Sequence, residues 1–341
     1  MTRPQNVLTL TLDHYHGLDR AMQQCLEQAR LAARTDLPIL ILGESGTGKT
    51  LLARAIHNSS ARSRGPFVSF NAAALSDTLI DSQLFGHERG AFTGAQNRLK
   101  GKFELAHTGS LFIDEIADLS PSGQAKILRA VEYGEFERLG SESIQLADVR
   151  LMSATHFPLA TFAQTEKFRQ DLLFRLSGLT ILLPPLRERR RDLPLLLASE
   201  VARASRAWEK SIVGLERKAA ERLFAHSWPG NLRELSRVID VAVAVTPSDV
   251  ITADSLLFQP FIQPSSAPAN AAADEVGADG SDGNGGLTLA AAESRHVREV
   301  LARMGGNKRR AAKALGISRS TLDRKLSSPA GDKANSPTKR H

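Results

Sequence analysis

The stretch Gly43-Glu44-Ser45-Gly46-Thr47-Gly48-Lys49-Thr50 decides the fold of this chain. It fits the pattern G-x-x-x-x-G-K-[ST], follows a short apolar run and precedes a segment with helical periodicity. The glycines let backbone N–H groups converge on phosphate oxygens, the Lys49 ammonium reaches the β- and γ-phosphates, and the Thr50 hydroxyl can ligate Mg²⁺. The N-terminus of the following helix adds partial positive charge. This order of strand, loop and helix predicts a nucleotide-binding P-loop rather than an ordinary glycine-rich turn.

Apolar runs of strand length alternate with helical patterns over the first 258 residues. The runs that we expect to form strands are Pro38–Leu42, Phe67–Phe70, Ser110–Ile113 and Val149–Ala154. Strands that are apolar on both faces and separated by helices favour a largely parallel sheet covered by helices, the α/β class. From Asp192 onward the pattern is mostly helical, which predicts a helical subdomain beside the sheet.

Two acidic residues, Asp114 and Glu115, follow the apolar run Leu111-Phe112-Ile113. Asp114 would hold Mg²⁺, directly or through water, and Glu115 would orient or deprotonate the attacking water. Neighbouring side chains of a strand point to opposite faces, so the backbone must turn one of the pair as the strand ends. Downstream of a P-loop, this pair predicts nucleotide hydrolysis rather than a solvated acidic turn.

The composition is that of a soluble globular protein, since 42% of the 341 residues are hydrophobic and 24% are charged. At roughly 150 residues per domain, the length suggests two or three domains. The one cysteine, Cys25, excludes a disulfide framework and a cysteine-clustered zinc site. No apolar run approaches the roughly 20 residues that cross a bilayer, and the N-terminus lacks an apolar signal segment. We expect no membrane span and a cytoplasmic, nucleoid-associated location.

The net charge of +7 is concentrated near the C-terminus. The segment Leu287–His341 contains thirteen Lys and Arg residues against four Asp and Glu residues, while the first 286 residues are close to neutral. A localised basic block is the expected footprint of a polyanion-binding region, most often one that binds nucleic acid. Charge alone leaves a solvated basic tail open as the alternative.

The segment Lys308–Leu326 within this block has the pattern of a helix-turn-helix. Small residues allow close helix approach, Gly316 gives the turn, and Ser318 can cap the second helix. With Leu322 facing inward, the second helix would present five residues to bases and phosphates, namely Arg319, Ser320, Asp323, Arg324 and Lys325. The pattern predicts binding to double-stranded DNA; a three-helix protein-contact module is the alternative.

The segment Gly90-Ala91-Phe92-Thr93-Gly94-Ala95 spells GAFTGA, and here the chain resembles the AAA+ ATPases that activate sigma-54 RNA polymerase, which touch sigma-54 with this signature. The stretches that resemble the same family are Gly43–Lys49, Gln83–Glu88, Leu128–Glu132, Pro184–Arg189, Trp228–Leu235 and, in its Fis-type helix-turn-helix, Leu287–Leu326. The resemblance implies an AAA+ P-loop fold with a helical lid, ATP and Mg²⁺ as cofactors, and sigma-54, RNA polymerase and enhancer-like DNA as partners.

The resemblance also assigns roles to residues outside the P-loop. Asn71 matches the position that hydrogen-bonds to the catalytic glutamate, here Glu115, and restrains it. Thr155 falls at the sensor position after the fourth strand, and Arg233 matches the sensor of the helical lid, which would report the phosphates.

Arg169 and Arg175 match the arginine-finger region of the family. On one straight helix a step of six residues is a rotation of about 600°, which leaves the two side chains about 240° apart, so they would diverge. One would reach the γ-phosphate of a neighbouring subunit while the other holds the subunit interface; a surface ion pair is the alternative for either. A finger supplied in trans makes hydrolysis depend on assembly into a ring, which we expect to be a hexamer.

The GAFTGA segment has glycine near both ends and a phenylalanine between them. An exposed Phe92 on a flexible loop suits a transient protein contact that moves with the nucleotide state, and Thr93 could add a polar contact. The alternative is a tight turn with Phe92 folded into the core.

Two residues depart from the pattern of the family that the chain resembles. Thr50 follows the P-loop lysine where the family usually has Glu, and His156 follows the sensor threonine where the family usually has Asn. His156 can still form a hydrogen bond, but its charge responds to pH.

We expect six segments along the chain. They are a lead (1–16), an α/β ATPase subdomain (17–190), a helical lid (191–258), a linker (259–286), a helix-turn-helix domain (287–326) and a polar tail (327–341). The short lead predicts a stand-alone activator without a sensory domain, controlled by a separate regulatory protein or by expression level.

Two rival functions remain open at this point. One is a DNA-binding repressor or architectural protein with a vestigial ATPase fold. The other is an AAA+ remodeller that acts on a protein other than sigma-54.

Overall fold

The computed structural model describes residues 10–73, 76–159, 161 and 167–258, together with residues 308, 310, 312 and 322. The chain divides into two units, Met1–Gln263 and Pro264–His341, and each is described by itself. Within the described part of the chain, no helix is long and apolar enough to cross a membrane.

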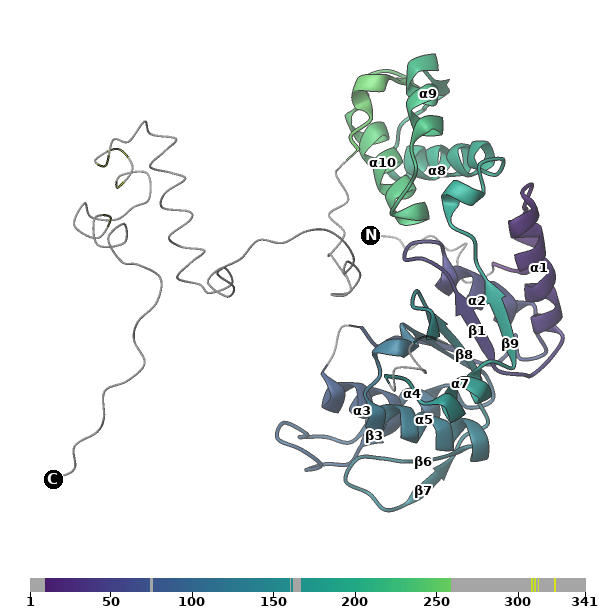
Figure 1. The fold of residues 1–341 in the computed structure, drawn as a ribbon, viewed down its shortest axis with the longest axis vertical. Helices are drawn as coiled ribbons and strands as arrows, with labels where there is room; N and C mark the ends of the chain where they lie inside the picture. Colours follow the sequence, from purple (N-terminus) through teal and green to yellow (C-terminus); the bar gives the residue numbers. More distant parts are fainter. Residues whose placement is uncertain are drawn as a thin grey trace, which may run out of the picture. The chain divides into compact units, whose positions relative to one another are not determined.

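A five-stranded sheet in the order β2-β5-β8-β1-β9 forms the centre of the first unit (Figure 1). Its strands are β1 (Ile39–Leu42), β2 (Phe67–Asn71), β5 (Ser110–Asp114), β8 (Arg150–Thr155) and β9 (Leu179–Leu182), and every pair is parallel. The four expected strands and the α/β class are therefore confirmed. β9 was not expected from the sequence.

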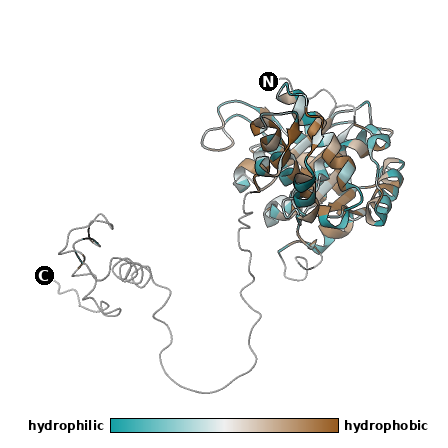
Figure 2. Ribbon diagram, turned by 90° about the horizontal axis from the view of Figure 1, so that it is seen from above, coloured by the Kyte–Doolittle hydropathy of each residue, from teal (hydrophilic) through white to brown (hydrophobic). Residues whose placement is uncertain are grey.

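Helices cover both faces of this sheet. One face carries α1 (Arg20–Ala33) and α2 (Lys49–Asn58); the other carries α3 (Asp77–Phe85), α4 (Lys102–Leu105), α5 (Pro121–Tyr133) and α7 (Gln170–Leu176). Side chains alternate between the two cores, since Ile39 and Ile41 of β1 pack on the α1 side and Leu40 packs on the other. Figure 2 shows the hydrophobic residues gathered in the central strands and the hydrophilic residues on the outer helices.

Two antiparallel hairpins extend from the second face. One joins β3 (Gly86–His87) to β4 (Leu99–Lys100), and the other joins β6 (Glu135–Glu137) to β7 (Ile144–Leu146). The hairpins are tied together, because the Leu139 amide donates to Gly86 O (3.0 Å) and the Glu88 amide donates to Leu139 O (3.0 Å).

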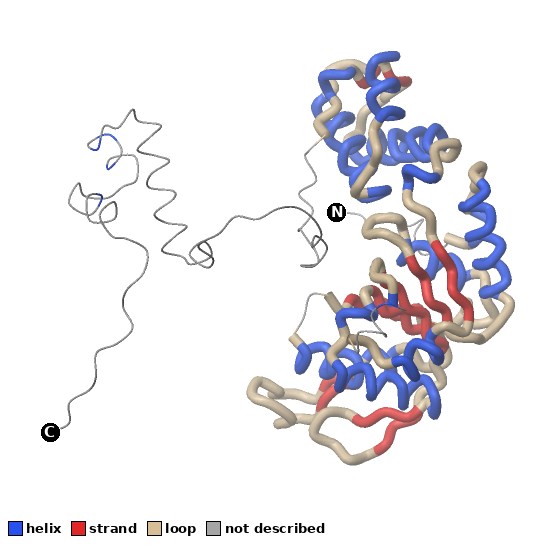
Figure 3. The backbone as a smooth tube through the Cα atoms, viewed as in Figure 1, coloured by secondary structure: helices blue, strands red, loops and turns tan. Residues whose placement is uncertain are grey.

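The expected helical subdomain follows the sheet and has a core of its own (Figure 3). It consists of α8 (Leu193–Ala207), α9 (Arg217–Ala225), α10 (Asn231–Val245) and the short parallel pair β10 (Gly214–Leu215) and β11 (Val250–Ile251). Single 3-10 turns complete the unit at Leu12–His14, Ile116–Asp118, Leu186–Glu188 and Ala253–Ser255. The buried Trp228 indole, which donates to Leu223 O, fixes the turn between α9 and α10.

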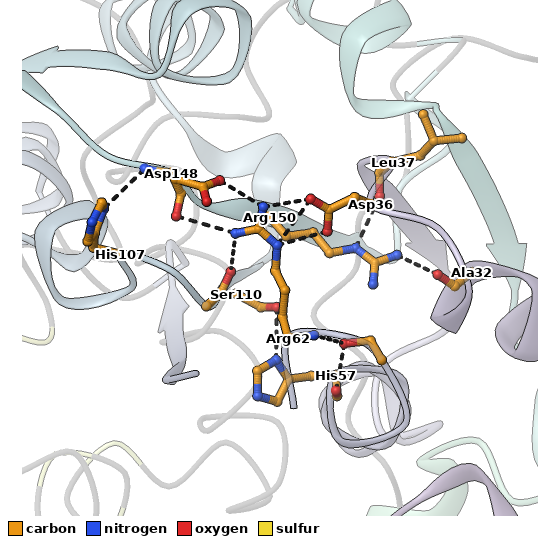
Figure 4. Close-up of polar contacts among 11 residues, drawn as sticks. Ala32, Asp36, Leu37, His57, Arg62, His107, Ser110, Asp148 and Arg150 are labelled. Carbon is orange, nitrogen blue, oxygen red and sulfur yellow. Dashed lines mark hydrogen bonds and ion pairs between the residues drawn. The ribbon is translucent and has the colours of Figure 1, made fainter. Parts of the chain in front are cut away.

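Paired charges hold the amino-terminal edge of the sheet (Figure 4). The Arg62 guanidinium, just beyond α2, donates to both oxygens of Asp36 at 2.6 to 3.1 Å and to Asp148 Oδ1 at 2.7 Å. Arg150, the first residue of β8, is 2% exposed and donates to the carbonyl oxygens of Ala32 and Leu37. These contacts join α1, α2, β1 and β8 at one edge, which leaves the opposite edge for the site.

In the second unit the described residues are Lys308, Arg310, Ala312 and Leu322, and all four are helical. Ala312 and Leu322 are buried, while Lys308 and Arg310 are exposed. This agrees with the inward face expected for Leu322. The residues expected to contact DNA, Arg319, Ser320, Asp323, Arg324 and Lys325, lie outside the described residues.

Candidate functional site

A cavity of about 430 Å³ opens at the carboxyl-terminal edge of the sheet. It brings together the P-loop, the two carboxylates and the lid sensor that the sequence singles out. Its lining includes Ser45, Gly46, Gly48, Lys49, Thr50, Asn71, Asp114, Glu115 and Arg233. Parallel α/β sheets bind ligands at this edge, where the strands end and the helices begin.

The P-loop adopts the conformation that its glycines allow. Gly46 and Gly48 have φ values of +79° and +102°, in the left-handed region that favours glycine. The largely buried Lys49 ammonium donates to Gly43 O (2.9 Å) and Glu44 O (3.3 Å), and lies 3.7 Å from Glu115 Oε1. The loop therefore surrounds the Lys49 ammonium at the N-terminus of α2, an arrangement that suits an anionic ligand.

The two carboxylates of β5 separate because the backbone turns between them. Asp114 is the last residue of the strand, and Glu115 has the left-handed backbone angles φ +54° and ψ +52°. Both side chains consequently line the same cavity. Burial raises the pKa of Asp114, and the nearby Lys49 ammonium opposes that rise.

Glu115 does not have the partner that the family resemblance assigns to it. The Asn71 amide oxygen accepts from the Ala73 backbone amide (2.8 Å), within its own loop. Glu115 Oε2 instead lies 2.8 Å from His156 Nδ1 and 3.3 Å from the His156 amide nitrogen. The expected Asn71–Glu115 hydrogen bond is therefore not formed in this structure, where His156 is the hydrogen-bond partner of Glu115.

The P-loop is fastened to the helical lid by side chains of two family-like motifs. Arg187 donates to both oxygens of Glu44 (2.6 and 2.8 Å), and this hydrogen bonding lowers the pKa of Glu44. The fully buried Asn231 donates to Glu44 Oε2 and to Ser45 O, and Arg233 donates to Ser45 Oγ (2.9 Å). These hydrogen bonds join the P-loop directly to the lid.

Backbone packing strengthens the same junction. The Leu232 amide donates to Gly46 O (3.0 Å), and a Cβ atom added at Gly46 would lie 2.4 Å from Gly230 O. Only glycine fits at this position, for reasons of space as well as backbone angle.

Sequence reasoning missed a second cavity of about 410 Å³ beside the P-loop. The residues around it are mostly apolar and come from the N-terminal lead, α1, α2, the segment after β9, α8 and α10. They include Leu10, Tyr15, Met22, Leu51, Leu183, Leu195 and Leu196, alongside Thr47 and Gly48 of the loop. An apolar hollow next to a phosphate-binding loop suits a planar base. No local motif marks it, because its walls come from distant segments.

Thr155 and the two candidate finger arginines lie outside the lining of the 430 Å³ cavity. Thr155 is fully buried at the end of β8, and its hydroxyl accepts from the Phe157 amide (3.1 Å). Arg169 is exposed and pairs with Asp171, while Arg175 is exposed in the last turn of α7. The predicted 240° separation of the two arginines does not apply, since α7 begins at Gln170 and Arg169 precedes it in extended conformation.

The GAFTGA segment forms the tip of the β3–β4 hairpin, which projects from the α/β body in Figure 1. Gly90 and Gly94 have φ values of +84° and +108°, and nothing lies within 4 Å of a Cβ atom placed on either. Thr93 is exposed, but Phe92 is half-buried, with its ring edge-on to His87 at 5.1 Å. The expectation of an exposed Phe92 is therefore corrected: the ring rests on its own hairpin, outside the sheet cores.

Charged side chains brace the base of this hairpin. Arg138, only 8% exposed, donates to Glu88 (3.1 Å) and Glu104 (2.9 Å). Because Arg138 belongs to the β6–β7 hairpin, the two hairpins are linked by charge as well as by backbone.

Three sequence profiles match: the sigma-54 interaction domain over residues 15–182, the AAA+ ATPase lid domain over residues 187–273, and the bacterial regulatory protein, Fis family, over residues 288–327. The transcriptional regulatory protein ZraR of Klebsiella oxytoca is 43% identical over 311 residues, or 91% of this chain and 68% of that protein. The chain belongs to the sigma-54-dependent transcriptional activators.

Other members of this activator family show similar agreement. The regulatory protein AtoC of Escherichia coli K12 is 41% identical over 305 residues, which cover 89% of this chain and 65% of that protein. The structure of NtrX from Brucella abortus in complex with ATP superposes with a TM-score of 0.65 at 33% identity, covering 92% of this chain and 68% of that chain. NtrX in complex with ADP gives the same values.

Family membership fixes the coarse description of this activator. It has an AAA+ ATPase core with a lid and a Fis-type helix-turn-helix, and it acts in transcription regulation with sigma-54 and DNA as implied partners. Structural relatives that hold ATP or ADP support nucleotide binding by the P-loop cavity.

Proposed function

We propose that this activator hydrolyses ATP in a ring of subunits, with a hexamer as the expected size, and uses the energy to remodel the closed promoter complex of sigma-54 RNA polymerase. The helix-turn-helix binds an enhancer-like upstream DNA site. The proposal includes the six expected segments, from the lead (1–16) to the polar tail (327–341). The observation that carries it is the cavity in which a P-loop lysine, two strand-end carboxylates and the lid arginine meet.

Each residue of the cavity has a role in this proposal. Lys49 and the P-loop amides bind the triphosphate, Arg233 contacts it from the lid side, and the apolar second cavity takes the base. Glu115 orients and deprotonates water, since its carboxylate faces the same space as Lys49. Thr155, the last residue of β8, acts as the sensor, while Asn71 lines the cavity without a hydrogen bond to Glu115.

The donor set also fits Mg²⁺. The Thr50 hydroxyl and the Asp114 carboxylate are hard oxygen donors on the lining of one cavity. Among the described residues no group of three or more His, Cys, Asp or Glu side chains gathers, which suits an ion held by two protein oxygens and the substrate rather than by a protein cage. When bound, Mg²⁺ neutralises phosphate charge.

Of Arg169 and Arg175, one reaches the γ-phosphate of a neighbouring subunit and the other holds the subunit interface. Both are exposed and lie outside the lining of their own cavity, which is where residues that act in trans belong. Hydrolysis then changes the junction between the P-loop and the lid and moves the Gly90–Ala95 tip against sigma-54.

The decisive experiment pairs Glu115→Ala with Thr93→Ala. Glu115→Ala should lose ATP turnover and sigma-54-dependent transcription together. Thr93→Ala, at an exposed position of the hairpin tip, should retain turnover and lose transcription. Transcription by Thr93→Ala would favour an AAA+ remodeller of another protein, and normal promoter control by Glu115→Ala would favour a DNA-binding regulator with a vestigial ATPase.

A further inference from the structure

His156 contacts the catalytic carboxylate at two points. Its ring nitrogen Nδ1 lies 2.8 Å from Glu115 Oε2, and its backbone nitrogen lies 3.3 Å from the same oxygen. The other oxygen, Oε1, lies 3.7 Å from Lys49 Nζ on the cavity lining. The side chain of Glu115 is 13% exposed, so these neighbours account for most of its polar surroundings.

The chemistry of the pair determines which atom donates. An ionised carboxylate only accepts hydrogen bonds, so Nδ1 of His156 must hold the hydrogen. The ring of Phe157 packs against the imidazole, 3.8 Å away between centroids, while the His156 side chain is 39% exposed. His156 also follows the last residue of β8 directly, so the rigid sheet fixes its backbone.

We propose that His156 is the positioning residue for Glu115 in ATP hydrolysis. It holds Oε2 from behind, which fixes the side-chain torsions of Glu115 and leaves Oε1 directed into the cavity to accept a proton from water. Asn71 makes no hydrogen bond to Glu115 in the observed arrangement; its amide oxygen accepts from the Ala73 backbone amide. This inference rests on the proposed role of Glu115 as the catalytic base.

The geometry of the imidazole suggests a sharp substitution test. Nδ1 is bonded to Cγ, the same position that the amide nitrogen takes in asparagine, whereas the amide of glutamine is one bond farther from the backbone. His156→Asn can therefore restore the donor at the same place, and His156→Gln cannot. His107→Ala is the matched control, because His107 is exposed and its Nδ1 accepts from the Asp148 amide at the opposite edge of the sheet.

The experiment measures kcat and KM for ATP on the full chain, with assembly checked by sedimentation and folding by thermal melting. We expect kcat of His156→Ala to fall about tenfold or more with KM within about twofold, as for loss of base positioning. His156→Asn should recover kcat to within about threefold of the wild type, His156→Gln should stay low, and His107→Ala should match the wild type.

Three results overturn the inference. They are an unchanged kcat in His156→Ala, a rise in KM without loss of kcat, and equal activity of the Asn and Gln variants. If His156→Ala does not fold, the comparison of Asn with Gln decides the matter. Glu115→Gln distinguishes failure of the proposed function from failure of the positioning role. If Glu115→Gln retains ATP turnover, the proposed function fails as well. If it is inactive while His156→Ala is active, only the positioning role of His156 fails.

Discussion

The two edges of the parallel sheet contain similar charged side chains and use them in opposite ways. At the carboxyl-terminal edge, Lys49, Asp114 and Glu115 face a cavity. At the amino-terminal edge, Arg62 is satisfied by two carboxylates within the fold. The pKa values follow this difference: burial raises that of Asp114, whereas the hydrogen bond from Arg62 lowers that of Asp36. The charged groups at the carboxyl-terminal edge face the cavity, where a ligand can reach them. Those at the amino-terminal edge are paired within the fold and stabilise it.

The largest expected effect is on the site edge. Lys49→Ala should lower ATP turnover by about 100-fold or more, since it removes the one cation of the loop that faces the phosphates. The free energy of unfolding should change by less than about 1 kcal/mol, because the ammonium only meets loop carbonyls and one carboxylate. Turnover assays and urea unfolding check both parts, with the exposed Lys218→Ala as control. Retained turnover would contradict the role of the cavity.

Arg150→Ala tests the other edge. Loss of this nearly buried side chain leaves a hole and removes the side-chain donor of the Leu37 carbonyl oxygen, so the free energy of unfolding should fall by about 2–3 kcal/mol. Turnover by the folded protein should be unchanged at low temperature. Urea unfolding measures the effect, and Arg217→Ala, on a surface pair, should change stability by less than about 0.5 kcal/mol. Equal effects of the two substitutions would show that burial at this edge contributes nothing.

Arg62→Ala should reduce stability by about 1 kcal/mol at neutral pH, since both acidic partners are well exposed and water screens them. A depressed carboxyl pKa gives stability that is complete above the unfolded value, about 3.9, and disappears as the pH falls through the folded value. The difference between wild type and variant should therefore narrow below about pH 4. Urea unfolding at pH 7 and pH 3 measures it; a gap that widens in acid would refute the pairing.

Asp114→Asn should have a small effect on stability, and it should stabilise the fold, whereas Arg150→Ala and Arg62→Ala should destabilise it. A carboxyl pKa raised by burial means that the charged form opposes folding, so stability is lost as the pH rises past the unfolded value. Replacing the charge should raise the free energy of unfolding at pH 7 by up to about 1 kcal/mol, while ATP turnover is lost. Thermal melting at pH 7 checks the direction, and a lower melting temperature would contradict it.

The local parts of this molecule could be predicted from the sequence. The P-loop and Asp114–Glu115 are contiguous motifs next to apolar strands, and their meeting at one edge follows from parallel topology. β9 was missed because a run of four residues, Leu-Thr-Ile-Leu, is too short to show a periodicity of its own. It is a strand because β1 offers it a parallel partner.

Contacts between distant segments could not be predicted. The resemblance assigned Asn71 to Glu115, but the turn at Ala73 and the position of His156 decide the actual partner. The start of α7 depends on Gln124, whose side chain accepts from the Arg169 amide 45 residues away. The cluster at the amino-terminal edge likewise spans more than a hundred residues, as the bond from Arg150 to Ala32 illustrates.

The packing of Gly46 against Gly230 has a consequence for how the molecule can change over time. A Cβ atom at position 46 would clash with the backbone carbonyl oxygen of Gly230, at 2.4 Å. Shortening a neighbouring side chain cannot remove a clash with the backbone. A suppressor mutation would have to shift the whole turn before α10. We therefore expect revertants of a Gly46→Ala strain to restore glycine at position 46. No single substitution elsewhere is expected to compensate for the change.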